Sequence, residues 1–429
     1  MKYYSTNGKV PPVSLREAVT QGLAGDNGLF MPERFDRLPD SFFDAIDCMS
    51  LQEISLAAAQ NFFGEDIPAD DLRHLVYDTL QFEIPLRRIT DRIYALELFH
   101  GPTMAFKDVG ARFMARLLAY FTRDAHREIN VLVATSGDTG SAVANGFYNV
   151  PGIKVFVLYP KGRVSTIQEK QFTTLGGNVS ALEVEGAFDD CQRMVKEAFL
   201  DRELNEAMTL TSANSINLAR LLPQSFYYYH GFAQMPDKSD VVCCVPSGNF
   251  GNICAGLIAK RTGLPIRHFI AGTNVNDVFP EYIRTGLYKP RASVATIANA
   301  MDVGNPSNFV RITDLYGHSH EAICRDISSY AYRDSTIRET IREVKARYGY
   351  LLDPHGAVGF KALEHYLASH DGTGFFIETA HPAKFTDTVE EIIGEPVPLP
   401  PALARFSAGR KQTTVIPATL DALKQYMLS

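Results

Sequence analysis

No apolar run in this sequence approaches the roughly 18 residues that a membrane-spanning helix requires, so we expect no membrane partner. Basic runs are also missing, and 42 Lys and Arg residues against 49 Asp and Glu residues give a net charge of −7. An acidic chain without basic runs is poorly suited to bind nucleic acid. The first residues lack the apolar segment of a secretory signal, and we therefore expect a cytoplasmic protein.

Disulfide and metal-binding patterns are missing as well. The six cysteines form no C-x-x-C pair, and a chain of 429 residues can build its core without disulfides, so we expect reduced thiols. The H-E-x-x-H pattern is absent, and His318 and His320 have no cysteine or carboxylate partners at ligand spacing. We predict no metal site, and we expect a monomer or a homodimer.

The composition, with 45% hydrophobic and 21% charged residues, is typical of a globular protein, and the length suggests two or three domains. The first part of the chain is rich in helix signals. Ser14 and Glu17 form a capping-box pattern that predicts a helix over about 14–24. Further helices are predicted over 51–63 and 69–80, so we expect a mainly helical N-terminal domain.

After this region, short β-branched or aromatic runs alternate with helical stretches. Continuous apolar strands between helices predict parallel sheets covered on both faces, in an α/β fold. Open sheets of this kind bind ligands beyond the carboxyl ends of their strands. The predicted strands cover 129–135, 154–159, 179–184, 209–212, 240–245, 266–271 and 374–378, and the predicted helices cover 108–121, 188–199 and 252–261.

Two glycine-rich turns each lie between a predicted strand and a predicted helix. They read TSGDTG over 135–140 and PSGNFGN over 246–252. Backbone amides at the start of a helix bind anions, and glycine allows the ligand to approach closely. Neither turn is a Walker A loop or a full G-x-G-x-x-G motif. The residues alone leave open whether each is an anion site or only a tight turn.

Lys107 ends the stretch ELFHGPTMAFK, directly before the predicted helix over 108–121. Partial burial and a positive helix end lower the pKa of a lysine, which favours the neutral amine needed for Schiff-base chemistry. The alternative is a solvated lysine at the start of a helix.

Taken together, the AFKD element at 105–108 and the two glycine-rich turns resemble the fold-type II pyridoxal-phosphate enzymes. GLFMP at 28–32, NSIN at 214–217, AMDV at 300–303 and TAHPAKF at 379–385 narrow the resemblance to the threonine synthase family, from about residue 3 to beyond 390. The resemblance implies two parallel-sheet α/β domains, as in the tryptophan synthase β subunit, plus a helical N-terminal domain. The implied boundaries are 1–90, a catalytic region over 91–390 with a smaller domain at about 110–213, and a C-terminal extension over 391–429.

The resemblance also implies which residues bind the cofactor. Lys107, next to Phe106, would hold pyridoxal 5'-phosphate as a Schiff base and then move protons. Thr379 would contact the ring nitrogen, and Asp138 stands where the wider superfamily has an asparagine near the ring hydroxyl. The cofactor phosphate would lie on Ser247, Gly248, Asn249, Phe250 and Gly251.

For the substrate, the resemblance implies O-phospho-L-homoserine, converted with water to L-threonine and phosphate in the last step of threonine biosynthesis. Its carboxylate would contact Thr135, Ser136 and Thr139, and its phosphate would contact Asn214, Ser215 and Arg220. A phospho-lyase or a serine/threonine dehydratase of the same fold is one alternative, and a non-catalytic pyridoxal-phosphate-binding protein is another.

Three residues near these motifs have no assigned role at this point. His100 and His381 either shape the pocket or pack beside it. Glu378 stands where the resembled family usually has a small residue, immediately before Thr379.

Overall fold

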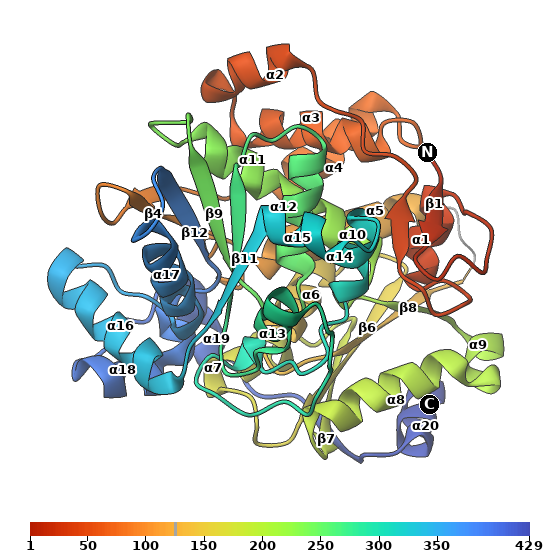
Figure 1. The fold of residues 1–429 in the computed structure, drawn as a ribbon. Coiled ribbons are helices and arrows are strands. Elements are labelled where there is room, and N and C mark those ends of the chain that lie inside the picture. The colour runs from red at the N-terminus through yellow and green to blue at the C-terminus, as the bar shows by residue number, and fades with distance from the viewer. Residues whose placement is uncertain (124–126) are drawn as a thin grey trace.

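The structure is a computed structural model that describes residues 1–123 and 127–429. The chain forms a helical N-terminal part and two α/β parts, each around its own sheet (Figure 1). Both predicted features of the first helix are present, because the Ser14 hydroxyl accepts from the Glu17 amide and the Glu17 carboxylate accepts from the Ser14 amide. The N-terminal part contains β1 (Tyr3–Ser5), α1 (Leu15–Gln21), β2 (Phe30–Pro32), α2 (Asp40–Ala45), α3 (Leu51–Phe63) and α4 (Ala69–Thr79).

The larger sheet has six strands in the order β11-β10-β9-β12-β4-β3, all parallel except for β3 at one edge. Its strands are β3 (Leu86–Arg88), β4 (Ile93–Glu97), β9 (Val241–Pro246), β10 (His268–Thr273), β11 (Ile327–Ala331) and β12 (Thr373–Glu378). Its helices include α11 (Phe226–Ala233), α12 (Gly251–Arg261), α13 (Val278–Thr285), α14 (Phe309–Leu315), α15 (His320–Asp326), α16 (Asp334–Tyr348), α17 (Pro354–Leu367) and α18 (Thr386–Ile393).

The smaller sheet has five strands in the order β13-β7-β6-β5-β8, and all of them are parallel. Its strands are β5 (Ile129–Ala134), β6 (Ile153–Pro160), β7 (Val179–Glu185), β8 (Thr209–Ser212) and β13 (Thr414–Pro417). The helices nearby in sequence are α5 (Lys107–Thr122), α6 (Asp138–Phe147), α7 (Thr166–Thr173), α8 (Phe188–Leu200), α9 (Arg202–Ala207), α10 (Leu218–Leu221), α19 (Pro401–Ser407) and α20 (Leu420–Leu428).

The predicted fold class is confirmed, since every residue of β5 and β9 is buried and both strands lie inside their sheets. The cysteines of the chain are free. Across 1–123 and 127–429, no helix combines the length and the apolar character needed to cross a membrane.

Each of the predicted site loops begins at the carboxyl end of a strand. TSGDTG follows β5, SGNFG follows β9, and Thr379 follows β12. The loops after β9 and β12 share the carboxyl edge of the larger sheet, where open α/β sheets bind ligands. The loop after β5 of the smaller sheet meets them through the contact between Asp138 and Lys384.

The sequence predicted only an extension after residue 390, whereas the structure places α19, β13 and α20 there. Ile416 of β13 pairs with Val184 of β7, and α20 packs beside α8 (Figure 1). Leu423 is fully buried in one apolar cluster with Cys191 and Met194. A four-residue edge strand gives too weak a pattern to be recognised without its partner.

Leu423 provides a test of this packing. We expect Leu423→Ala to lower the free energy of unfolding by about 2–5 kcal/mol, because it leaves a cavity in the cluster between α20 and the smaller sheet. Leu428, on the same helix and 42% exposed, is the matched control. Leu428→Ala should change stability by less than about 0.5 kcal/mol. Urea unfolding of both variants measures the difference, and equal effects would contradict the packing.

Candidate active site

Lys107 is the first residue of α5, and the loop before it is fastened to the segment that follows β12. Ala105 forms an antiparallel bridge with Ala380, and the Phe106 amide donates to the Thr379 carbonyl at 2.8 Å. The connection fixes Lys107 next to Thr379, although the two residues are far apart in sequence.

Protein surrounds most of the Lys107 side chain, and its amine makes no hydrogen bond to the described residues. Loss of hydration lowers the pKa of Lys107 to about 8, with smaller contributions from the positive charges of Lys384 and Arg220. Asp138 acts in the opposite direction and raises it. A lysine with this pKa is partly neutral near physiological pH, as a nucleophilic amine requires.

The SGNFG turn provides an anion-binding cradle. Phe250 adopts a left-handed conformation with φ of 61°, directly before α12. The amides of Gly248, Asn249, Phe250 and Gly251 have no acceptor in the described part of the chain. A Cβ at Gly248 would lie 2.3 Å from the Ala300 carbonyl oxygen, so only glycine fits there. Free amides at a helix start fit a phosphate.

Two residues of this turn are fixed by other bonds. The Ser247 amide donates to the Gly272 carbonyl and its hydroxyl donates to the Val245 carbonyl. The Asn249 side-chain oxygen accepts from the Ser307 amide at 2.9 Å. Ser247 therefore shapes the cradle with both donors already used, while its predicted contact with the cofactor phosphate stays a prediction.

The TSGDTG turn is organised around a buried hydroxyl. Thr135 Oγ1 accepts from the amides of Gly137 and Gly140 at 2.9 and 2.8 Å and donates to the Gly137 carbonyl. The amides of Ser136 and Thr139 have no acceptor within residues 1–123 and 127–429. Ser136 and Thr139 are thus available to a carboxylate, while the Thr135 hydroxyl is already used inside the turn.

Asp138 forms an ion pair that the sequence did not reveal. Its Oδ1 lies 2.6 Å from the Lys384 Nζ and accepts from Gln168 Nε2 at 2.8 Å. Lys384 is fully buried and also donates to the Thr103 carbonyl at 2.8 Å. Burial alone would raise the pKa of Asp138, but the charges of Lys384 and Lys107 hold it well below its usual range. Asp138 is therefore a carboxylate.

Arg220 lies in α10 and is almost completely buried. Its guanidinium donates to the Ala213 carbonyl, while its Nε is buried without a partner in the described residues. Burial lowers its pKa to about 10, so it remains cationic. Asn214 donates to the Ala134 carbonyl at 3.2 Å, which ties its turn to the end of β5. An unpaired buried donor on a cation fits an anionic ligand.

Arg311 is a second buried guanidinium that sequence reasoning missed. It donates to the Phe30 and Ile216 carbonyls at 2.9 and 2.8 Å, and to the Ser215 carbonyl at 3.4 Å. Arg311 thereby connects β2 of the N-terminal part to the turn that carries Ser215. Asn308 completes the connection, since its amide group donates to the Ser215 hydroxyl.

The Thr379 hydroxyl makes no hydrogen bond to the described residues, which fits its predicted contact with a ring nitrogen. Glu378 points to the opposite face, as neighbouring residues on a strand do. Its carboxyl lies against Gly356, where a Cβ would come within 1.6 Å of Oε2, and it accepts from the Asp353 amide. Glu378 therefore fills space beneath the site and does not enter it.

Both histidines have local roles. His100 Nε2 lies 2.8 Å from the Glu97 carboxylate, and His381 Nδ1 accepts from the Ala383 amide at 3.1 Å. Burial lowers the pKa of His381 to about 4, so it is neutral. The parts of the chain that the structure describes contain no cluster of three or more potential metal ligands.

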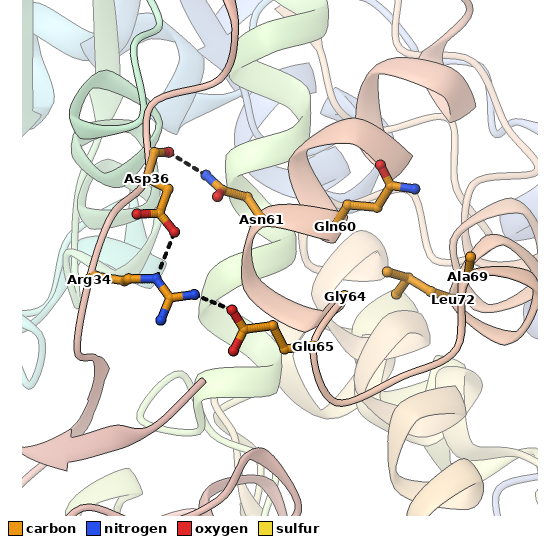
Figure 2. A pocket seen from close by; sticks show the side chains of 8 residues that line it. All are labelled: Arg34, Asp36, Gln60, Asn61, Gly64, Glu65, Ala69 and Leu72. Atoms are coloured by element: carbon orange, nitrogen blue, oxygen red, sulfur yellow. Dashed lines mark hydrogen bonds and ion pairs between the residues drawn. The ribbon is translucent and has the colours of Figure 1, made fainter.

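A surface pocket of about 330 Å³ lies apart from these residues, on the N-terminal part (Figure 2). Its charged groups pair with one another, as Arg34 does with Asp36 at 2.7 Å and with Glu65. The pocket contains none of the predicted site residues.

Three family models match this chain. The family model "Pyridoxal-phosphate dependent enzyme" matches residues 80–374, "Threonine synthase N terminus" matches 2–80, and "Threonine synthase, C-terminal" matches 356–427. The threonine synthase of Escherichia coli is 43% identical over 434 residues, all of both chains.

Solved structures agree with these matches. The crystal structure of Escherichia coli threonine synthase has a TM-score of 0.94 and covers 100% of this chain and 99% of that one, at 42% identity. A pyridoxal-phosphate-bound threonine synthase from Brucella melitensis has a TM-score of 0.93 at 36% identity, covering 99% and 98%.

The fold and the site define a pyridoxal-phosphate-dependent enzyme. More narrowly, the chain belongs to the threonine synthase family. The resemblance carried by the sequence motifs is thus confirmed, and so is the cofactor.

Glu378 provides a test of the packing beneath the site. Burial, followed by the charge of Asp353, raises the pKa of Glu378 well above its usual value. A group with a raised folded pKa contributes stability at low pH and loses it as the pH rises. We expect Glu378→Gln to match the parent near about pH 4 and to become progressively more stable relative to it by about pH 8.

Urea unfolding across this pH range measures the effect. Glu391→Gln changes a carboxyl that is 65% exposed and is the matched control, with no such trend expected. A pH-independent difference between Glu378→Gln and its parent would contradict a raised pKa of Glu378 in the folded chain.

Proposed function

We propose that this chain catalyses the threonine synthase reaction, in which O-phospho-L-homoserine and water give L-threonine and phosphate. One observation carries the proposal beyond family membership. Arg220 buries a cation with an unpaired Nε beside the Asn214–Ser215 turn, at a site whose reactive amine is Lys107. A buried cation without a carboxylate partner favours a substrate that brings its own negative charge.

The residues that would hold the cofactor are those whose hydrogen-bond donors have no partner in the described part of the chain. The amides of Gly248, Asn249, Phe250 and Gly251 would hold the phosphate of pyridoxal phosphate at the start of α12, and the Thr379 hydroxyl would meet its ring nitrogen. When bound, the cofactor supplies an electron sink that stabilises negative charge on substrate carbons. A neutral hydroxyl partner does not force the ring nitrogen to stay protonated, which suits elimination and replacement.

Substrate binding uses the donors that remain. The amides of Ser136 and Thr139 would bind the substrate carboxylate at the start of α6, where the helix dipole favours an anion. Ser215 and Arg220 would bind the substrate phosphate, with the guanidinium as the charge-assisted donor. The carboxylate and the phosphate would thus be held from two different strand ends, with the reacting carbons between them.

In the proposed reaction, Lys107 carries protons to and from the substrate carbons. Its amine, with a pKa near 8, takes a proton from Cα and then moves protons between the reacting carbons. A proton then leaves Cβ, the Cγ–O bond breaks, phosphate leaves with the bonding electron pair, and Cγ takes a proton to become a methyl group. The oxygen of water bonds to Cβ as water gives up the proton that balances the departed phosphate, and a final proton returns to Cα.

A dehydratase of the same fold is the main alternative, and Arg220 distinguishes the two. A dehydratase substrate carries no phosphate, so it gives no reason to bury this cation with an open donor. A phospho-lyase would keep Arg220 but release an oxo acid. A cytoplasmic location, a monomeric or homodimeric state, the domain boundaries and the absence of nucleic-acid binding remain predictions.

Lys107→Ala tests the assignment of the cofactor lysine. We expect the variant to lose turnover and the visible absorbance of covalently bound pyridoxal phosphate, because the amine that reacts with the cofactor aldehyde is gone. Spectra and borohydride trapping measure this loss. Lys196→Ala, at an exposed lysine on α8, should behave like the parent. If borohydride still fixed the cofactor to Lys107→Ala, another lysine would hold it.

Arg220→Ala tests the assignment of the phosphate site. A charge-assisted bond in a shielded site contributes about 1.5–3 kcal/mol. We therefore expect kcat/KM for O-phosphohomoserine to fall at least about tenfold, the equivalent of ~1.4 kcal/mol. Affinity for 2-aminobutyrate, which lacks phosphate, should change little. Equal losses for both ligands would mean that Arg220 supports the fold or the carboxylate site.

A further inference from the structure

Lys384 lies outside the roles described so far, although it reaches the centre of the site. It belongs to η4 (Pro382–Phe385), the short helix that follows β12 of the larger sheet. Its side chain is fully buried and reaches Asp138, at the start of α6 beside the smaller sheet. Burying an ammonium is costly unless it is paired and hydrogen-bonded, and Lys384 satisfies both conditions through Asp138 and the Thr103 carbonyl.

The charges around Lys107 come from four elements. Lys107 and Asp108 start α5, Asp138 starts α6, Arg220 lies in α10, and Lys384 lies in η4. Asp108 faces away, because its carboxylate accepts from the Thr103 amide and hydroxyl at 2.9 and 2.6 Å. Among the carboxylates that the structure describes, Asp138 alone raises the pKa of Lys107.

Lys107 and Lys384 therefore compete for one carboxylate. Lys384 Nζ lies 2.6 Å from Asp138 Oδ1, and Gln168 helps to fix this carboxylate by donating to the same oxygen. Lys107 forms no ion pair within 4.0 Å among the described residues. The arrangement leaves the amine of Lys107 without a counter-ion, the condition under which a lysine is most easily neutral.

We propose that Lys384 is a positioning residue that holds the Asp138 carboxylate on its own ammonium, and so keeps Lys107 neutral enough to react with the cofactor aldehyde. The proposal rests on the proposed function only in assigning Lys107 to the cofactor. Besides Lys384, Lys107 is the cation whose charge acts on Asp138, so without Lys384 the carboxylate would stabilise Lys107 as an ammonium. An opposite charge within about 4–6 Å raises the pKa of a lysine by about 1–3 units.

The opposing effects of Asp138 and Lys384 also predict that removing Asp138 partly reverses the effect of removing Lys384 on the pKa of Lys107. The negative charge of Asp138 and the positive charge of Lys384 act in opposite directions on the pKa of Lys107, so the two removals should partly offset each other. Asp138→Asn alone should leave Lys384 unpaired and shift Lys107 toward lower pKa. The double variant Asp138→Asn/Lys384→Met carries neither charge, so its midpoint for cofactor capture should lie closer to that of the parent than the midpoint of Lys384→Met does. Lys384→Arg keeps the ion pair and should do the same.

The test measures how fast the full-length chain, freed of cofactor, captures pyridoxal phosphate between about pH 6 and 10. The rate is followed by visible absorbance, and comparison between variants cancels the titration of the cofactor itself. For the parent we expect a midpoint near pH 8, the pKa of Lys107. For Lys384→Met we expect a midpoint at least about one pH unit higher.

Lys411→Met is the matched control, since Lys411 pairs with Glu169 and Glu183 and is absent from the charges that act on Lys107. It should leave the midpoint unchanged even if it lowers stability. Where Lys384→Met folds, return of the midpoint toward the parent value in the double variant supports the proposal. Where Lys384→Met fails to fold, a lower midpoint in Asp138→Asn supports it, and an unchanged or higher one contradicts it.

Two results would overturn the proposal. One is an unchanged or lower midpoint in a folded Lys384→Met chain. The other is a double variant with the same defect as Lys384→Met, which would make the contact with Thr103 the only role of Lys384. A parent chain that captures no cofactor at Lys107 would contradict the proposed function instead, so the two failures are distinguishable.

Discussion

The site depends on the buried ion pair between Lys384 and Asp138. Lys384 follows the last strand of the larger sheet and Asp138 starts the helix after β5 of the smaller sheet, so the contact joins both sheets at their ligand-binding ends. Removing one partner would leave a buried charge uncompensated, which costs about 3–5 kcal/mol. The same contact decides which cation receives the carboxylate, and it thereby connects the packing of the fold to the reactivity of Lys107.

Positive charge exceeds negative charge around this ion pair, which favours anionic ligands. The charges of Lys384 and Arg220 act on Lys107, and those of Lys384 and Lys107 act on Asp138. Arg311 adds another buried cation beside Ser215. Free amides at the starts of α6 and α12 also favour anions, because the N-terminal end of a helix carries partial positive charge. A cofactor phosphate, a substrate carboxylate and a substrate phosphate would together supply the missing negative charge.

Much of this could be predicted from the sequence, because apolar strands and glycine-rich turns are local patterns. The strands before TSGDTG and SGNFG were predicted within one residue of their ends, and Lys107 was placed at the start of its helix. The roles of Lys384 and Arg311 could not be predicted, since each depends on a partner that only folding brings near. The edge strand β13 was missed for the same reason, and the role of Glu378 was left open until the structure placed its carboxyl against Gly356.

The central claim is that a phosphorylated substrate meets a lysine of lowered pKa in a pocket built for two phosphates. The most direct measurement follows phosphate and amino-acid products together when the purified chain acts on O-phospho-L-homoserine in ¹⁸O-labelled water. The account predicts equal amounts of phosphate and L-threonine, with the label in the threonine hydroxyl and unlabelled phosphate. Release of phosphate with 2-oxobutyrate in place of threonine, or label in the phosphate, would contradict it.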